Sequence, residues 1–181
     1  TSFFRLYGWN PPAISLGYNQ SGNEFNLSKL SLAGIDLVRR PTGGRAILHW
    51  NELTYSAIVP IENRSLKEIY HFINRGLLQG VRMMGIQAVL FDSSSSTEQL
   101  YHQTTSAACF SSSAKSEIQY QGRKLIGSAQ RKIGNVVLQH GSLLLGPQHL
   151  QIATFLSDDD LPHQQNIKQH LLHHATDAST I

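Results

Sequence analysis

Three short blocks of this sequence combine glycine with basic and hydroxyl side chains. They span Arg39–His49, Gly122–Gln130 and Gln139–Ser142. Glycine allows a backbone to approach a ligand closely, and a few fixed polar groups then orient that ligand. Three blocks of this kind in a chain of 181 residues indicate an active site.

Each block also has a purely structural interpretation. The first is not a nucleotide-binding P-loop, because no Gly-Lys-Ser/Thr follows Gly43 and Gly44, and a tight turn would account for both glycines. The arginines on both sides of that turn exceed what a structural hairpin requires. Lys124 would fit a surface lysine and His140 a hydrogen-bonded core histidine, but the small residues beside both favour positions that face a ligand.

Cys109 is the only cysteine, which excludes a disulfide framework and a cysteine-rich zinc site. A lone cysteine is most often a small buried hydrophobic residue. Its place after a long polar stretch, and ahead of the strand pair that carries Lys124, makes a nucleophile the competing interpretation. The polar stretch, residues 92–106, has too few apolar side chains to be strongly ordered, and we expect a mobile loop there.

Apolar periodicity predicts an α/β (α+β) fold with a mixed, largely antiparallel sheet packed with helices. Turn signals at Gln121-Gly122 and Gly134-Asn135 should join the last three strands as antiparallel neighbours. In the strand of Lys124, regular alternation would place that lysine on one face with Ile126 and Ser128. Strand patterns cover residues 3–9, 13–18, 36–40, 46–49, 52–60, 87–91, 116–120, 123–129 and 136–145, and helical patterns cover 26–33, 65–84 and 147–155.

Length and charge indicate one domain over residues 1–181, with a mild net charge of +3. Residues 157–181 are predicted to be a polar terminal segment, either a solvated helix or a frayed tail. Its histidines lack a partner motif, so no metal site is predicted. The charge would suit acidic protein partners but forms no nucleic-acid stripe. Without a signal-like segment or a long apolar run, we expect a cytoplasmic protein with no membrane association.

The blocks, together with the motifs at Arg5–Gln20 and Glu52–Ser56, resemble the catalytic domain of the lipoate and biotin protein ligase family. Arg45 stands where adenylate-forming ligases usually carry a third glycine, and we expect no accessory domain of the kind that those ligases often have. The motifs around Cys109, Gly127 and His140 are most similar to octanoyltransferases of the LipM type, which use a cysteine and no ATP. The family's chain normally begins with a helix and a strand that are missing here, so we expect residues before Thr1.

The resemblance implies a mechanism and a set of site residues. Cys109 matches the acyl-thioester nucleophile, and Lys124 matches the lysine that lowers the pKa of that thiol. The donor would be octanoyl-acyl carrier protein, and the acceptor a lipoyl-carrier protein such as the glycine cleavage H protein or an E2 lipoyl domain, with no cofactor. The residues implied to line the acyl and carbonyl site are Arg40, Thr42, Gly43, Gly44, His49, Ala129, Arg131, His140 and Ser142.

Two other functions remain open from the sequence. In an ATP-dependent lipoate or biotin protein ligase, Lys124 would bind an acyl adenylate and Cys109 would be inert. A noncatalytic module could hold an acyl chain or a carrier protein through the same fold. If the transferase interpretation holds, the acceptor lysine must be neutral to attack, and the sequence identifies no base for it.

Overall fold

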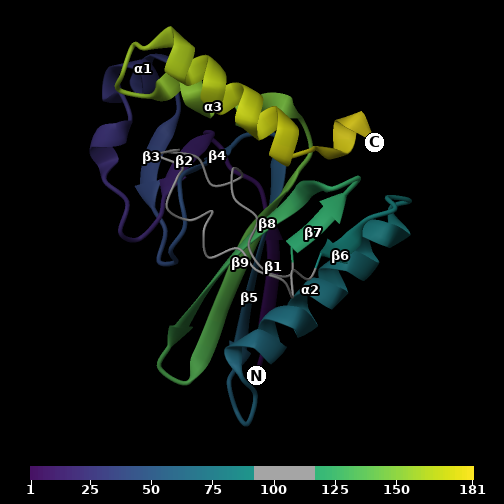
Figure 1. Cartoon of the computed structure of the whole chain (residues 1–181). Helices are drawn as coiled ribbons and strands as arrows, with labels where there is room; N and C mark the ends of the chain where they lie inside the picture. The colour runs from purple at the N-terminus through teal and green to yellow at the C-terminus, as the bar shows by residue number, and fades with distance from the viewer. Residues whose placement is uncertain (92–116) are drawn as a thin grey trace, which may run out of the picture.

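The computed structural model describes residues 1–91 and 117–181 of the chain. Cys109 and the loop expected at residues 92–106 lie outside the described residues. The described part contains two sheets, and helices lie beside each of them (Figure 1).

The larger sheet has six strands in the order β1-β5-β9-β8-β7-β6, and all neighbouring strands are antiparallel. Gln121 and Gly122 both have positive φ, at 48° and 76°, as a tight two-residue hairpin turn requires. The predicted antiparallel arrangement of the last strands is therefore confirmed. The strands are β1 (Phe3–Tyr7), β5 (Glu52–Pro60), β6 (Val89–Phe91), β7 (Glu117–Tyr120), β8 (Arg123–Ile133) and β9 (Val136–Leu144).

The smaller sheet has three strands, with β2 (Ala13–Leu16) in the centre. Strand β3 (Asp36–Arg39) pairs with it in parallel, and β4 (Ile47–His49) pairs with it antiparallel. A short helix, α1 (Leu27–Leu32), connects β2 to β3, and the Asn26 side chain caps it by accepting from two backbone N–H groups. This connection brings the start of the first glycine-rich block to the end of β3.

Helix α2 (Leu66–Met83) lies along the larger sheet (Figure 1). Ser65 and Glu68 form a capping box at its start, at the first residue of the predicted helical range. Ile73 is buried and packs with Ile69 and Val81 against the sheet, whereas Phe72 is exposed. Leu66, in the first turn of the helix, is exposed as well.

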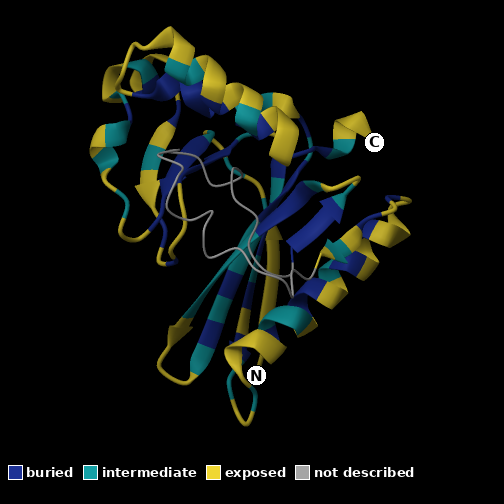
Figure 2. Ribbon diagram, viewed as in Figure 1, coloured by how far each residue is buried: buried dark blue, intermediate teal, exposed yellow. Residues whose placement is uncertain are grey.

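The C-terminal part covers the smaller sheet. Residues 147–155, predicted as a helix, form 3-10 turns (η4, Pro147–Phe155), and α3 (Leu161–His174) follows them. Ile167 and Leu171 of α3 are buried with Ala175 in the core of the smaller sheet, and Figure 2 shows the alternation of buried and exposed positions along this helix. The frayed-tail alternative for residues 157–181 is therefore wrong, because Ile167 and Leu171 anchor one face of the helix.

Candidate active site

A cavity of about 210 Å³ lies where the two sheets meet. Its walls come from β2, β3 and β4 of the smaller sheet and from β5, β8 and β9 of the larger one. Its lining includes five of the residues expected at the site, which are Arg40, His49, Ala129, His140 and Ser142.

Strand register explains why the third block contributes two of these side chains. His140 and Ser142 are two positions apart on β9 and so point to the same face. Ser142 is opposite Thr54 on one side, and His140 is opposite Ala129 on the other. The motif in β5 and the blocks in β8 and β9 thus meet on one face of the larger sheet.

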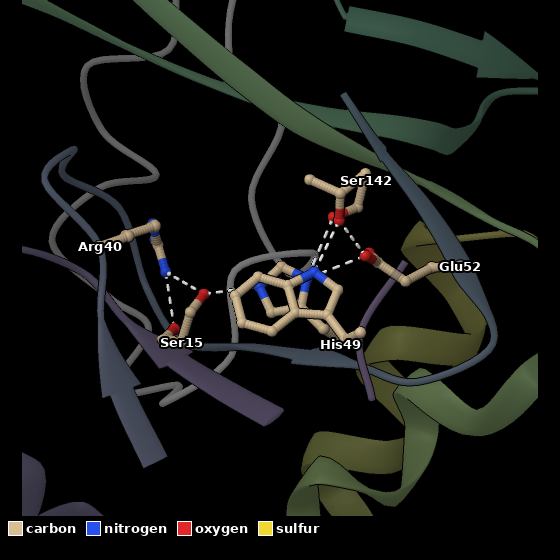
Figure 3. Close-up of polar contacts among 7 residues, drawn as sticks. Ser15, Arg40, His49, Glu52 and Ser142 are labelled. Carbon is tan, nitrogen blue, oxygen red and sulfur yellow. Dashed lines mark hydrogen bonds and ion pairs between the residues drawn. The ribbon is translucent and has the colours of Figure 1, made fainter. Parts of the chain in front are cut away.

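His49 lies at the centre of a buried hydrogen-bond network on the cavity wall (Figure 3). Its Nε2 is 2.7 Å from the Ser15 hydroxyl oxygen, and its Nδ1 is 3.0 Å from Glu52 Oε1. The Ser142 hydroxyl is a more distant neighbour, at 3.4 Å from Nδ1. Both ring nitrogens of His49 therefore have fixed partners.

Two further contacts hold the acid and the imidazole in place. The Thr54 hydroxyl donates to Glu52 Oε1 and accepts from Trp9 Nε1 at 2.8 Å. The Trp9 ring stacks on His49, with centroids 4.3 Å apart and an angle of 14° between the rings. The imidazole is thus constrained at both edges and on one face.

Arg40 shapes the first glycine-rich block. Its buried guanidinium donates to the carbonyls of Ser15, Gly43 and Arg45, at distances between 2.5 and 2.9 Å. A Cβ added to Gly17 would lie 1.8 Å from the Gly44 carbonyl oxygen, so the two loops are in close backbone contact. Gly43 and Gly44 are absent from the cavity lining and serve to fold the loop around Arg40.

Thr42, also expected in the lining, contacts the site through another residue. Its buried hydroxyl lies 2.5 Å from His140 Nε2. Burial, followed by the charges of Arg40 and His49, lowers the pKa of His140 to about 4. His140 is therefore a neutral imidazole at physiological pH, able to donate as well as accept a hydrogen bond.

Arg131 lies outside the cavity lining. It donates to the Pro41 carbonyl at 2.6 Å and lies over the Tyr18 ring, 4.3 Å from the centroid. These contacts join β8 to the loops that follow β2 and β3, so Arg131 supports the walls of the site.

Lys124 is buried and forms an ion pair with Glu117, with 2.5 Å between Nζ and Oε1. It does not belong to the cavity lining. Strand β8 carries an extra residue here, because Lys124 pairs with Gln119 whereas Ile126 pairs with Ile118. The regular alternation expected for Lys124, Ile126 and Ser128 is therefore interrupted between the first two.

Four residues of this region were not predicted from the sequence: Trp9, Ser15, Glu52 and Glu117. The first three lie within motifs that carry the family resemblance, which was the available signal. In residues 1–91 and 117–181, no group of three or more His, Cys, Asp or Glu side chains could hold a metal ion. No helix in these ranges is long and apolar enough to cross a membrane.

The two-sheet fold is that of lipoate ligase catalytic domains. Residues 1–177 match the lipoyl protein ligase A/B catalytic domain, and the chain belongs to this family. Among solved structures, the bi-partite lipoate protein ligase of Thermoplasma acidophilum aligns over 99% of this chain and 63% of its own, with a TM-score of 0.76 and 18% identity. A lipoate-protein ligase A bound with ATP aligns over 97% of this chain and 75% of its own chain, with a TM-score of 0.66 and 18% identity. The expected fold is thus confirmed.

Curated relatives carry a more specific name, Octanoyltransferase LipM. The protein of that name from Kyrpidia tusciae is 45% identical over 146 residues, and that from Bacillus subtilis is 40% identical over 147 residues. Each alignment covers 78% of this chain and 53% of the relative. The chain thus spans about half the length of the curated relatives it matches.

Proposed function

We propose that this protein is an octanoyltransferase of protein lipoylation. It transfers an octanoyl group from acyl carrier protein to Cys109, and then to a lysine of a lipoyl-carrier protein. The observation that carries the proposal is the identity of 40–45% to proteins named Octanoyltransferase LipM. The fold and the cavity between the two sheets are compatible with it.

The first half-reaction exchanges one thioester for another. The Cys109 thiolate attacks the octanoyl carbonyl carbon, a new carbon–sulfur bond forms, and the thiolate of the carrier protein leaves. Only the thiolate is a good nucleophile, and a nearby cation favours it. Lys124 is the proposed cation, and its pairing with Glu117 holds the ammonium at a defined place between β7 and β8.

The second half-reaction forms an amide. The amine of the acceptor lysine attacks the thioester carbonyl, the Cys109 thiolate leaves, and the amine nitrogen loses a proton. An amide is more stable than a thioester, so this transfer proceeds without ATP. Arg40, His140 and Ser142 supply polar groups at the cavity where the octanoyl carbonyl would be bound.

A mass measurement tests this function directly. The chain is incubated with octanoyl-acyl carrier protein in the absence of ATP, and the intact mass is recorded for wild type and for Cys109→Ser. We expect wild type to gain one octanoyl group through a thioester bond that hydroxylamine cleaves. An unmodified wild-type protein would contradict the proposal.

The second candidate is an ATP-dependent lipoate ligase. The fold shared with a lipoate-protein ligase A bound with ATP is the observation in its favour. Transfer of free octanoate or lipoate to an H protein only when ATP is added, and undiminished in Cys109→Ser, would establish that function instead.

The acyl carrier protein donor, the lipoyl-carrier acceptor and the cytoplasmic location remain parts of this proposal. For the acceptor, further support comes from a solved neighbour, the Thermoplasma acidophilum ligase, whose structure is described with its E2 lipoyl domain. The single-domain organisation over residues 1–181 is likewise a prediction.

A further inference from the structure

Ser15, His49 and Glu52 form a chain of hydrogen bonds with one consistent direction. Ionised Glu52 can only accept, so His49 Nδ1 donates to it across 3.0 Å. In the neutral imidazole, Nε2 is then the acceptor, and it accepts a hydrogen bond from the Ser15 hydroxyl across 2.7 Å. This is the order of donors and acceptors in a Ser-His-acid triad.

The groups around Ser15, His49 and Glu52 favour the same direction for these hydrogen bonds. Arg40 Nη1 donates to the Ser15 hydroxyl oxygen at 3.2 Å, which leaves the hydroxyl proton to point toward His49. The Thr54 hydroxyl donates a hydrogen bond to Glu52 Oε1, the same oxygen that accepts from His49 Nδ1. Trp9 covers one face of the imidazole and reaches Thr54 with its indole N–H. The acid is therefore held as an acceptor, and the ring has one defined orientation.

The chain of hydrogen bonds ends at the cavity. Ser15 and His49 both belong to its lining, beside Arg40 and Ser142 (Figure 3). Glu52 is not among the lining residues, and it contacts the site through His49 Nδ1. A substrate in the cavity can thus meet Ser15 and His49, whereas Glu52 acts only through the imidazole.

We propose that Ser15 and His49 form the proton acceptor for the attacking lysine amine, and that Glu52 is the positioning residue for His49. This inference rests on the proposed octanoyltransferase function. It assigns a base to the half-reaction for which the sequence identifies none.

Amide formation moves one proton from the attacking amine to His49. The amine nitrogen bonds to the thioester carbonyl carbon and, as it does so, passes one proton to the Ser15 oxygen. Ser15 passes its own hydroxyl proton to His49 Nε2, and the imidazolium is stabilised by Glu52. The carbon–sulfur bond to Cys109 then breaks, the amide is released, and the imidazolium returns its proton to the thiolate or to water.

Single-turnover kinetics separate this role from a structural one. Acyl-enzyme formation from octanoyl-acyl carrier protein is measured by mass, and transfer from the isolated acyl-enzyme to unmodified H protein is measured separately. His49→Gln, Glu52→Gln and Ser15→Ala should slow the second step by about 10²-fold or more, the range of general base catalysis, and leave the first unchanged. Imidazole added to His49→Ala should restore part of the transfer rate.

Matched control variants repeat each chemical change at an exposed site. His173→Gln on α3, Glu62→Gln after β5 and Ser31→Ala on α1 should leave both steps unchanged. The inference is overturned if the three site variants leave the second step unaffected, or slow both steps equally. It is also overturned if the octanoyl group of wild type maps to Ser15, since the hydroxyl would then be a nucleophile.

Nitrogen-15 NMR of wild type tests the arrangement without any variant that must fold. The neutral His49 imidazole should show a protonated Nδ1 and an unprotonated Nε2, and the opposite tautomer would refute the relay. A wild-type protein with this tautomer that forms no acyl-enzyme would refute the proposed function. A wild-type acyl-enzyme with unaffected site variants would refute the relay alone.

Discussion

Lys124 and Glu117 face each other from adjacent strands, with 2.5 Å between the ammonium nitrogen and the carboxylate oxygen, and both side chains are at most 6% exposed. The two strands form a hairpin, so the pair lies close to the turn at Gln121 and Gly122. The backbone of Lys124 also accepts a hydrogen bond from Thr176 N–H at 2.9 Å. The lysine expected to activate the nucleophile is therefore held by a carboxylate and by the C-terminal segment.

Removing one partner of the Lys124–Glu117 ion pair should lower the free energy of unfolding more than replacing both partners with apolar residues. Glu117→Leu or Lys124→Met alone leaves one buried charge without its ion-pair partner, which typically costs about 3–5 kcal/mol of unfolding free energy. The double variant Glu117→Leu/Lys124→Met should recover much of that loss. Urea unfolding of the four proteins gives the coupling energy, and a double variant as unstable as the sum of the singles would contradict the buried pair.

Lys124 should also control the reactivity of Cys109. In Lys124→Ala, the pKa of the Cys109 thiol should rise by about a unit or more if the ammonium lies within about 4–6 Å of it. Alkylation by iodoacetamide would then slow near neutral pH and recover as the pH rises. Lys124→Arg should keep part of the effect, because the charge survives with a different geometry.

An alkylation profile for Lys124→Ala that overlays that of wild type would remove the lysine from this role. Lys29→Ala is the matched control, since its ammonium pairs with Asp159 near the C-terminal part of the chain. It should leave the Cys109 profile unchanged.

His140 should make folding stability depend on pH. Its folded pKa is lowered to about 4 from an ordinary value of 6.5, so the unfolded chain binds the proton more readily as the pH falls. The stability contribution is fully present above the unfolded pKa and is lost as the pH falls toward 4. Between pH 7.5 and 5 the loss should be about 2 kcal/mol.

Denaturant unfolding of wild type and His140→Gln at the two pH values measures this loss. The variant should lose less stability than wild type on acidification, by about the same amount. Parallel pH dependences for the two proteins would show that His140 titrates alike in the folded and unfolded chains.

Gly141 should tolerate no side chain. A Cβ at this position would lie 2.1 Å from the Gly127 carbonyl oxygen and 2.7 Å from the Tyr55 ring, which reaches over Gly141 to bond Ser128 at 2.7 Å. Gly141→Ala should therefore destabilise the protein by about 1–3 kcal/mol or more, as overpacking does. A thermal or urea melt measures the change.

Gly80 provides the contrast for that substitution. It lies within α2, and a Cβ there would meet no heavy atom within 4 Å. Gly80→Ala should stabilise the protein by about 0.5–1 kcal/mol, because alanine restricts the unfolded chain and favours the helix. Equal effects of the two alanines would contradict the crowding at Gly141.

Local patterns in the sequence were sufficient for the strands, for helices α1 and α2, and for the family. Ser65 and Glu68 predict the start of α2, and the turn residues at 121–122 and 134–135 predict the antiparallel order of the last strands, because capping and turn geometry involve neighbours in the chain. The spacing of His140 and Ser142 on one strand likewise places them on one face.

Only the tertiary structure showed which distant groups meet. Ser15 of β2 reaches His49 of the adjacent strand β4, and Trp9, which follows β1, reaches Thr54 of the adjacent strand β5. Strand order and the packing of the sheets decide these contacts. The extra residue in β8 interrupts the alternation after Lys124, and Glu117 becomes its partner through a hairpin register that no periodicity predicts. Side chains buried between elements far apart in the chain select one another only after the hydrophobic faces of those elements have packed together.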